Sequence, residues 1–235
     1  MDRLERVGEE WVATASNGTS YSAPSVVLAL PFEQTQRLVA GLPDADRVKL
    51  PGFDQFVHAP ITTIHVWFDR AVTEMDHAAL LDTRIQWMFN KSQIRRDEPE
   101  AKGETGQYLE LVISASFAEL EMGREEILTS ALKELAGFFP KVKDATVVKA
   151  GILKEARATF SVVPGLDRFR PEAKTAVAGM FLAGDWTRTG WPSTMEGAVR
   201  SGRLAAAAVA EAAGNRVGFL TPEAAPTGFM RLLSR

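Results

Sequence analysis

Hydrophobic and polar residues alternate in several stretches near the start of the chain, a pattern typical of strands with one buried face. Residues 10–15 (EWVATA) alternate, and the pair Asn17-Gly18 predicts a type I′ turn that closes a hairpin. The continuous apolar run at 25–30 (SVVLAL) predicts a buried strand. Apolar residues at helical spacing follow over 32–40. This succession of strand and helix indicates α/β topology.

The middle of the chain has the pattern of a sheet covered by a helix. Residues 61–68, 85–89 and 108–113 predict three strands. The polar stretch at 91–106 predicts a solvated loop, with a functional lid as the alternative. Residues 119–139 predict an amphipathic helix that covers this sheet. The apolar stripe of that helix consists of Leu120, Ile127, Leu128, Leu132 and Leu135.

The last part of the chain returns to alternating strand and helix patterns. Residues 177–183 predict a short buried strand that ends at Gly184-Asp185. The alanine-rich stretch 195–213 predicts a long helix that Gly214-Asn215 ends. Before them, extended chain is predicted at 145–148, 152–153 and 158–163.

Composition and charge narrow the class of protein. The chain has 235 residues, of which 46% are hydrophobic, enough for a sizeable core and too many for a disordered chain. A net charge of −3 without a basic tract excludes a dedicated nucleic-acid binder. The absence of cysteine excludes disulfides and thiolate metal sites. We expect no metal site, because His58, His65 and His77 have no metal-ligand spacing, and we interpret His65 as structural.

The ends of the chain bear on its location. No apolar stretch reaches the about 20 residues that a membrane-spanning helix needs. The charged start MDRLER lacks the apolar core of a secretory signal, so we expect a cytoplasmic protein. The stretch 218–235 combines apolar anchors such as Phe219 and Phe229 with arginines, which predicts peripheral membrane contact, with a frayed tail as the alternative.

The segment 181–202 (FLAGDWTRTGWPSTMEGAVRSG) carries the candidate chemistry, because it joins a predicted strand, a glycine-acid turn and a capped helix. Gly184 would let the backbone approach a ligand, and Asp185 would accept hydrogen bonds from ligand hydroxyls, with a turn cap as its alternative role. The tetrad 193–196 (STME) matches the S-x-x-E capping box, in which Ser193 and Glu196 satisfy amides at the helix start.

The start of this predicted helix is also a candidate binding site. Free amides and roughly half a positive charge at a helix start suit a phosphate, or a carbonyl oxygen that gains negative charge as in a reduced flavin. Small residues along one helix face permit close approach to a dinucleotide, with tight packing as the alternative. These residues are Gly197, Ser201, Ala205 and Ala208.

At these residues the sequence resembles the flavin-containing amine oxidase and carotenoid desaturase superfamily, whose chains close with a similar A-G-D turn and M-E-G-A helix. More narrowly, residues 183–202 resemble the hydroxysqualene dehydroxylases, also called squalene-associated FAD-dependent desaturases. The same resemblance extends to 61–70 (ITTIHVWFDR), 85–91 (IQWMFNK) and 154–165 (KEARATFSVVPG).

The resemblance implies an FAD cofactor and assigns candidate positions to it. The pyrimidine end of the flavin would meet amides near Thr194, Met195 and Glu196. The turn at Gly184 and Asp185 would serve the ribityl-pyrophosphate region. No catalytic side chain is assigned, since the cofactor would carry out the redox step.

The sequence departs from the superfamily in one large respect. Chains of the superfamily open with a G-x-G-x-x-G turn, and this sequence contains no such turn. Residues 10–30 instead resemble an internal hairpin and strand of the family. We therefore expect a carboxyl-terminal portion from a truncated or split gene, with an amino-terminal half encoded separately. The expected parts are a partial FAD-domain hairpin, strand and helix at 1–50, a substrate domain at 51–165, returning FAD-domain pieces at 166–214 and a tail at 215–235.

The expected fold class is therefore α/β: an α+β substrate sheet with the returning strand and helix of a Rossmann-like FAD domain whose amino-terminal dinucleotide-binding βαβ unit is missing. The implied reaction is reductive dehydroxylation of hydroxysqualene to squalene, with an apolar isoprenoid as substrate. The alternatives are another FAD-dependent desaturase or amine oxidase, and a non-catalytic fragment or interaction subunit. Trp87 and Trp191 are candidate substrate-lining residues, whereas Trp67 is expected in the core.

Overall fold

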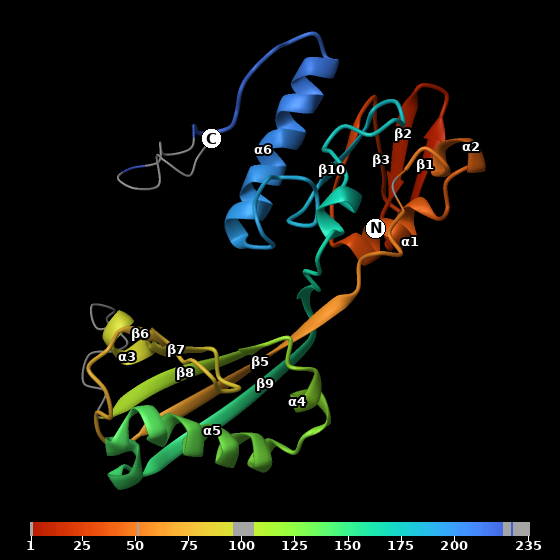
Figure 1. Ribbon diagram of the computed structural model, residues 1–235. Coiled ribbons are helices and arrows are strands. Elements are labelled where there is room, and N and C mark those ends of the chain that lie inside the picture. Colours follow the sequence, from red (N-terminus) through yellow and green to blue (C-terminus); the bar gives the residue numbers. More distant parts are fainter. Residues whose placement is uncertain (1, 51, 96–105, 223–226, 228–235) are drawn as a thin grey trace. The chain divides into compact units, whose positions relative to one another are not determined.

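The computed structural model describes residues 2–50, 52–95, 106–222 and 227, and these form two compact units. One unit comprises the described residues of Met1–Phe56 and Val162–Arg235, and the other comprises Val57–Ser161 (Figure 1). The first unit contains two sheets and the second contains one, and each unit has its own packed core. The mixture of helices and strands confirms the expected α/β class.

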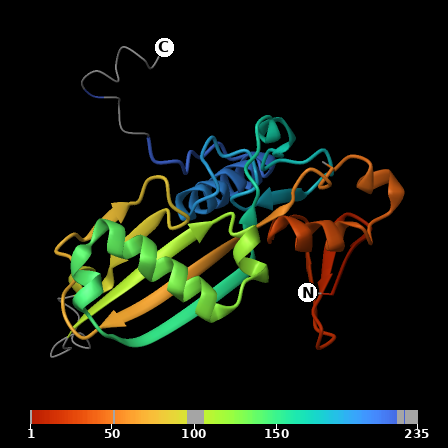
Figure 2. The ribbon, with the colours of Figure 1, turned by 60° about the horizontal axis from the view of Figure 1, so that its bottom comes forward.

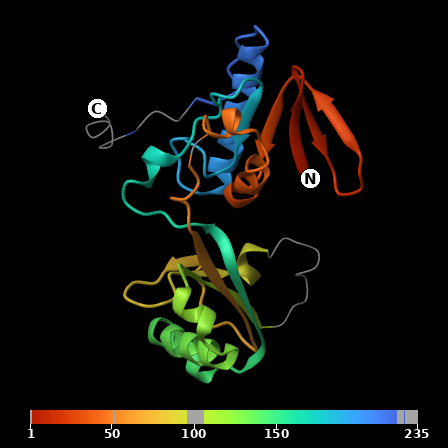
Figure 3. The ribbon, with the colours of Figure 1, turned by 90° about the vertical axis from the view of Figure 1, so that its right-hand side faces the viewer.

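The first unit is built from a three-stranded antiparallel sheet and a two-stranded parallel sheet. Strand β10 lies between helix α6 and the three-stranded sheet (Figures 1 and 3). Its four residues are all buried, as expected for a strand covered on both faces. The elements are β1 (Arg3–Val7), β2 (Glu10–Thr14), β3 (Ser20–Ala23), β4 (Val26–Ala29), α1 (Phe32–Val39), α2 (Asp44–Arg47), η3 (Leu166–Phe169), β10 (Met180–Ala183) and α6 (Met195–Ala212).

The hairpin between β2 and β3 forms as expected, but its turn differs from the predicted type I′. Gly18 takes a left-handed φ of +82°, whereas Asn17 keeps a negative φ. The amide of Gly18 donates to the Ala15 oxygen (2.9 Å), and the amide of Ala15 donates to the Thr19 oxygen (2.8 Å). This is a longer loop with a single left-handed glycine, since a type I′ turn requires positive φ at both central residues.

Strand β4 is shorter and more exposed than predicted. Of its residues only Leu28 is buried, and Val27 is 42% exposed. The reason is that α6 packs against β10, where Ala205 meets Ala183, and leaves the Val27 face of β4 open. The buried strand expected at 25–30 is therefore buried on one face.

The second unit is a five-stranded antiparallel sheet in the order β6-β7-β8-β5-β9. Helix α5 lies across one face of this sheet (Figure 2). Ile127, Ala131 and Leu135 form the buried stripe of the helix, because residues four apart share one face. The elements are β5 (His58–Phe68), β6 (His77–Ala79), β7 (Trp87–Asn90), α3 (Lys91–Ile94), β8 (Gln107–Ser114), α4 (Phe117–Glu121), α5 (Arg124–Phe138), η2 (Pro140–Asp144) and β9 (Val147–Phe160).

Two predictions for this unit are corrected. The single helix expected over 119–139 is broken, because Met122 and Gly123 adopt extended backbone with ψ near 150°. The ammonium of Lys154 donates to the main-chain oxygens of Leu120 (3.0 Å) and Met122 (2.6 Å), which stabilises the end of α4. The separate runs predicted within 145–163 form one strand, β9.

Two other predictions fall partly outside the described residues. The solvated loop or lid expected at 91–106 begins as helix α3, whose first turn is capped by the Asn90 side chain, and residues 96–105 are not described. Within the tail expected at 215–235, the described residues 215–222 form no helix. The anchor Phe229 lies outside the described residues.

Candidate functional site

The turn after β10 has a conformation that only glycine adopts readily. Gly184 has a φ of +148°, and a Cβ placed there would lie 2.3 Å from Nε1 of Trp186. The amide of Gly184 donates to Oγ of Ser201 on α6 (2.8 Å), and its carbonyl accepts from Oγ1 of Thr187 (2.8 Å). The turn is therefore fixed against both α6 and the following loop.

The start of α6 is capped one residue later than the sequence predicted. Thr194 is the N-cap, and its Oγ1 accepts a hydrogen bond from the Gly197 amide (3.1 Å). The Ser193 hydroxyl instead donates to Oδ2 of Asp185. The expected Ser193–Glu196 capping box is therefore wrong, because Thr194 has the extended backbone of an N-cap and Ser193 is engaged by the preceding turn.

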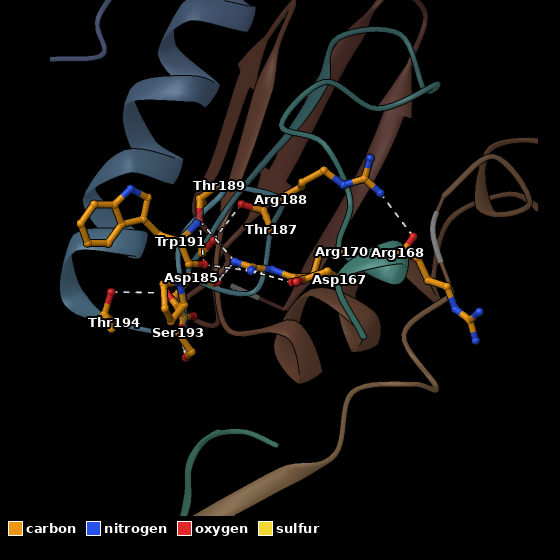
Figure 4. A network of polar contacts seen from close by, with 12 residues as sticks. Asp167, Arg168, Arg170, Asp185, Thr187, Arg188, Thr189, Trp191, Ser193 and Thr194 are labelled. Carbon is orange, nitrogen blue, oxygen red and sulfur yellow. Dashed lines mark hydrogen bonds and ion pairs between the residues drawn. The ribbon is translucent and has the colours of Figure 1, made fainter. Parts of the chain in front are cut away.

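The remaining predicted positions at the helix start are open to solvent. Met195 is 89% exposed, and Thr194 and Glu196 are also exposed. The amides of Met195 and Glu196 have no intrahelical acceptor, since they lie in the first turn of the helix. These amides belong to the same short segment as the Asp185 carboxylate. That carboxylate is hydrogen-bonded to Ser193, two residues before Met195 (Figure 4).

A buried arginine holds this loop together. The Arg170 guanidinium donates to the main-chain oxygens of Asp185 (2.8 Å) and Trp191 (2.9 Å). It also donates to Oγ1 of Thr189 (3.3 Å) and pairs with Asp167 (3.1 Å) (Figure 4). A planar guanidinium provides several donors in fixed directions, so one side chain can join separate parts of the loop.

Sequence reasoning missed Arg170, because the residues it joins lie 15 and 21 positions further along the chain. No local spacing marks such a contact. The only signal was a charged residue directly before Pro171, in a segment that leads into a buried strand.

Two tryptophans near this turn have different environments. Trp186 is buried, and its indole N–H donates to the Leu30 oxygen (2.9 Å), which joins the carboxyl ends of β10 and β4. Trp191, a predicted substrate-lining residue, is 38% exposed. The Arg200 guanidinium lies 5.6 Å from the centre of the Trp191 ring, a cation–π contact that orients it.

The other predicted substrate-lining residue, Trp87, lies in the second unit, on the sheet face opposite α5. It is 43% exposed and stacks on Phe89, with ring centroids 5.9 Å apart. Trp67 lies on this face as well, stacked on Tyr108 at 4.2 Å. The expectation that Trp67 is a core residue is therefore wrong: it alternates with the buried Val66 and Phe68 and must point away from them.

Polar groups also lie on this face, opposite α5. Nδ1 of His65 and the Tyr108 hydroxyl are hydrogen-bonded at 2.7 Å. This bond gives His65 a partner within the protein, as expected for a structural histidine. Burial raises the pKa of the Tyr108 phenol above its usual value, and the neighbouring Glu110 carboxylate adds to this effect. The Lys149 ammonium lies 4.6 Å from the Trp67 ring centre.

Within the described ranges, no three histidine or acidic side chains gather as ligands for a metal ion. None of the helices in the described part of the chain is long and apolar enough to cross a membrane.

Comparisons with known proteins identify relatives. The family described as flavin containing amine oxidoreductase matches residues 2–210. The 15-cis-phytoene desaturase of Solanum lycopersicum is 31% identical over 205 residues, which cover 83% of this chain and 34% of that protein. The 15-cis-phytoene desaturase of Synechococcus elongatus is 31% identical over 80% of this chain and 40% of its own length. The chain thus spans well under half of these relatives.

Solved structures share the fold at low sequence identity. Putrescine oxidase superposes with a TM-score of 0.63 at 14% identity, over 90% of this chain and 47% of that one. Cyclohexylamine oxidase from Brevibacterium oxydans gives a TM-score of 0.61 at 18% identity, over 91% and 48%. Both support the predicted fold class.

Proposed function

This chain belongs to the family of flavin containing amine oxidoreductases, and on that premise we propose that it forms part of an FAD-dependent oxidoreductase that acts on a long apolar isoprenoid. The observation that carries the proposal is the Arg170-braced turn, which brings the Asp185 carboxylate and the first amides of α6 into one short segment. Isoprenoid substrates are suggested by the relatives, which are named as desaturases of phytoene.

The chemistry of this segment fits a flavin. The first-turn amides of the exposed residues Met195 and Glu196 can donate to a flavin carbonyl oxygen, and the positive end of α6 favours negative charge there. Asp185 can accept hydrogen bonds from ribityl hydroxyls. When bound, FAD would supply hydride transfer, which needs no catalytic constellation of side chains. The residues of this chain would bind and orient the ring.

Two glycines of the segment, Gly184 and Gly197, serve the protein's own packing. A Cβ on Gly197 would lie 2.6 Å from the Pro192 oxygen, so glycine is needed for the chain to turn into α6. The binding role is therefore assigned to the amides and to Asp185, and the glycines are assigned to the shape of the turn.

For the substrate side we propose the sheet face of the second unit that lies opposite α5. Its aromatic side chains Trp67, Trp87 and Phe89 offer an apolar surface, and Trp87 and Leu153 are 43% and 59% exposed there. Leu153 shares this face because it pairs with Thr63 on β5. An apolar ligand would gain roughly 25 cal/mol for each Å² that it covers.

Two reactions of the same cofactor are distinguished by the direction of electron flow. Reductive dehydroxylation of hydroxysqualene to squalene is the reaction that we propose from the four sequence segments at 61–70, 85–91, 154–165 and 183–202. Desaturation is the second candidate, and the relatives named as phytoene desaturases favour it. A non-catalytic interaction subunit is the third reading.

The test supplies the missing G-x-G-x-x-G region, which this sequence does not contain. The chain is co-expressed with an amino-terminal segment of a family member, and flavin absorbance per chain is measured with and without that segment. We expect stoichiometric FAD only with the segment. Under anaerobic conditions, hydroxysqualene should then oxidise the reduced flavin and restore its visible absorbance band. If the protein is a desaturase, phytoene should instead bleach the oxidised flavin.

Each outcome has a different meaning. If neither substrate changes the flavin band in the loaded assembly, the isoprenoid proposal is wrong, and a small amine that bleaches it would indicate an amine oxidase. If no FAD is retained in either preparation, the chain is a non-catalytic subunit. Stoichiometric FAD on the chain alone would contradict the assignment of a separate dinucleotide-binding half.

A further inference from the structure

We infer that the His65–Tyr108 pair is a hydrogen-bonding subsite for a hydroxyl group on an otherwise apolar isoprenoid. Nδ1 of His65 lies 2.7 Å from the Tyr108 hydroxyl, on the face of the sheet opposite α5. The inference rests on the proposed function, because it assumes that an apolar ligand lies against this face. It deepens that function by naming the side chains that would recognise the hydroxyl of an isoprenoid alcohol and so distinguish it from a pure hydrocarbon.

The strand register puts the pair at the centre of the face. On β5, His65 lies opposite Glu110 of β8 on one side and opposite Gly151 of β9 on the other. Gly151 has no side chain, so no side chain of β9 stands directly opposite His65 in the register. Tyr108 pairs with Trp67, and the two rings are nearly parallel, at 9°. The stack fixes the direction of the phenol.

The surroundings of the pair are mainly aromatic, with charges that are already partnered. Glu110 pairs with Lys91 (3.3 Å), and Lys149 lies over the Trp67 ring. Glu110 also faces Phe89 on β7. Both groups of the pair keep hydrogen-bonding capacity beyond the bond that they share.

That capacity matches a hydroxyl group. Tyrosine can donate one hydrogen bond and accept others, and the His65 ring keeps Nε2 after the bond through Nδ1. An alcohol both donates and accepts, so it can hydrogen-bond to the groups of the pair. A hydrocarbon cannot, and covering the pair would leave polar atoms without a partner. A single neutral hydrogen bond corresponds to a preference of about threefold to tenfold for the alcohol.

The alternative is that the pair only stiffens the sheet face. In that case its removal would weaken every ligand equally or affect stability alone. The two roles are separated by comparing an alcohol with a hydrocarbon of the same carbon skeleton, because only the subsite distinguishes them.

The test uses the full chain with farnesol and farnesene in mixed detergent micelles, measured by titration calorimetry. We expect farnesol to bind about threefold to tenfold more tightly than farnesene. Tyr108→Phe keeps the aromatic stack and should lower the affinity for farnesol to that for farnesene. The affinity for farnesene should be the same in the variant as in the unmodified chain. Tyr21→Phe is the matched control, because Tyr21 is the only other tyrosine and is 70% exposed in the first unit. If Tyr108→Phe does not fold, His65→Leu replaces it with the same expectation.

A second readout reports on the pair directly. The chain contains only three histidines, so the ring nitrogens of His65 can be followed by NMR after ¹⁵N-histidine labelling. Farnesol should shift the His65 signals and farnesene should not. Equal affinity for both ligands, or an equal loss for both in Tyr108→Phe, would overturn the subsite and leave the isoprenoid proposal standing. Binding of neither ligand would overturn both.

Discussion

The Arg170 guanidinium donates from Nη2 to the main-chain oxygen of Asp185 across 2.8 Å. Because the Arg170 side chain is only 7% exposed, the bond is shielded from water and fixes the backbone of the turn from which the Asp185 carboxylate projects. The carboxylate itself is held by Ser193. Backbone and side chain of the proposed flavin-contacting acid are thus oriented by two different residues.

We predict that Arg170→Met destabilises the first unit by about 3 kcal/mol, because it removes a buried guanidinium that donates to the partly buried carbonyl oxygens of Asp185 and Trp191. Arg170→Lys should recover part of this loss, since one ammonium cannot reach all of the acceptors. Denaturant unfolding measures the effect. Arg168→Met is the matched control, an exposed arginine whose loss should cost less than about 1 kcal/mol. Equal effects of the two methionine variants would refute the bracing role.

We predict that Asp185→Ala lowers FAD affinity about tenfold or more in the co-expressed assembly, because a ligand hydroxyl would lose its charged acceptor. The FAD affinity of Asp185→Asn should lie between those of the unmodified protein and of Asp185→Ala, since the Asn amide oxygen can still accept hydrogen bonds from Ser193 and from the ribityl chain. Flavin retained after dialysis gives the measurement, with Glu9→Ala as a control at an exposed carboxylate in the turn before β2. Unchanged flavin retention in Asp185→Ala would remove Asp185 from the cofactor site.

We predict that Gly184→Ala destabilises the protein by about 3 kcal/mol or more. The new Cβ would combine an unfavourable backbone conformation with a clash against Trp186. Gly190→Ala is the matched control, because its φ is +75° and no atom lies within 4 Å of the new Cβ, so backbone strain of about 1–2 kcal/mol is expected alone. If thermal unfolding shows a smaller loss of stability in Gly184→Ala than in Gly190→Ala, the turn at Gly184 relaxes around the new Cβ and the prediction is wrong.

We predict that part of the stability of the second unit disappears at acid pH through Asp69. Hydrogen bonds from Arg70 and from the Thr146 amide lower the pKa of Asp69 to about 2. The unfolded chain binds this proton at about pH 4, so the contribution is complete above that value and is lost as pH falls towards 2. Asp69→Asn should flatten the dependence of unfolding free energy on pH in this window. Glu74→Gln, at an exposed carboxylate of the same unit, should not reproduce that flattening.

The limits of prediction from sequence are clear at the start of α6. The tetrad 193–196 indicated a helix start to within one residue, because N-cap side chains act within a single turn. Which hydroxyl would cap it depended on whether Ser193 was needed elsewhere, and the Asp185 carboxylate, eight residues away, decided that. For Trp67, period-two alternation indicated a strand but could not tell which face α5 would cover.

The sequence by itself determined the local elements: the alternation over 61–68, the helical spacing over 32–40 and the strand-turn-helix segment at 181–202. These depend on contacts between residues a few positions apart, which spacing records directly. Only the tertiary structure brought Arg170 to the turn at Asp185, and His65 to Tyr108, 43 residues further along the chain. Sheet register and packing bring such pairs together, and neither register nor packing produces a periodic pattern in the sequence.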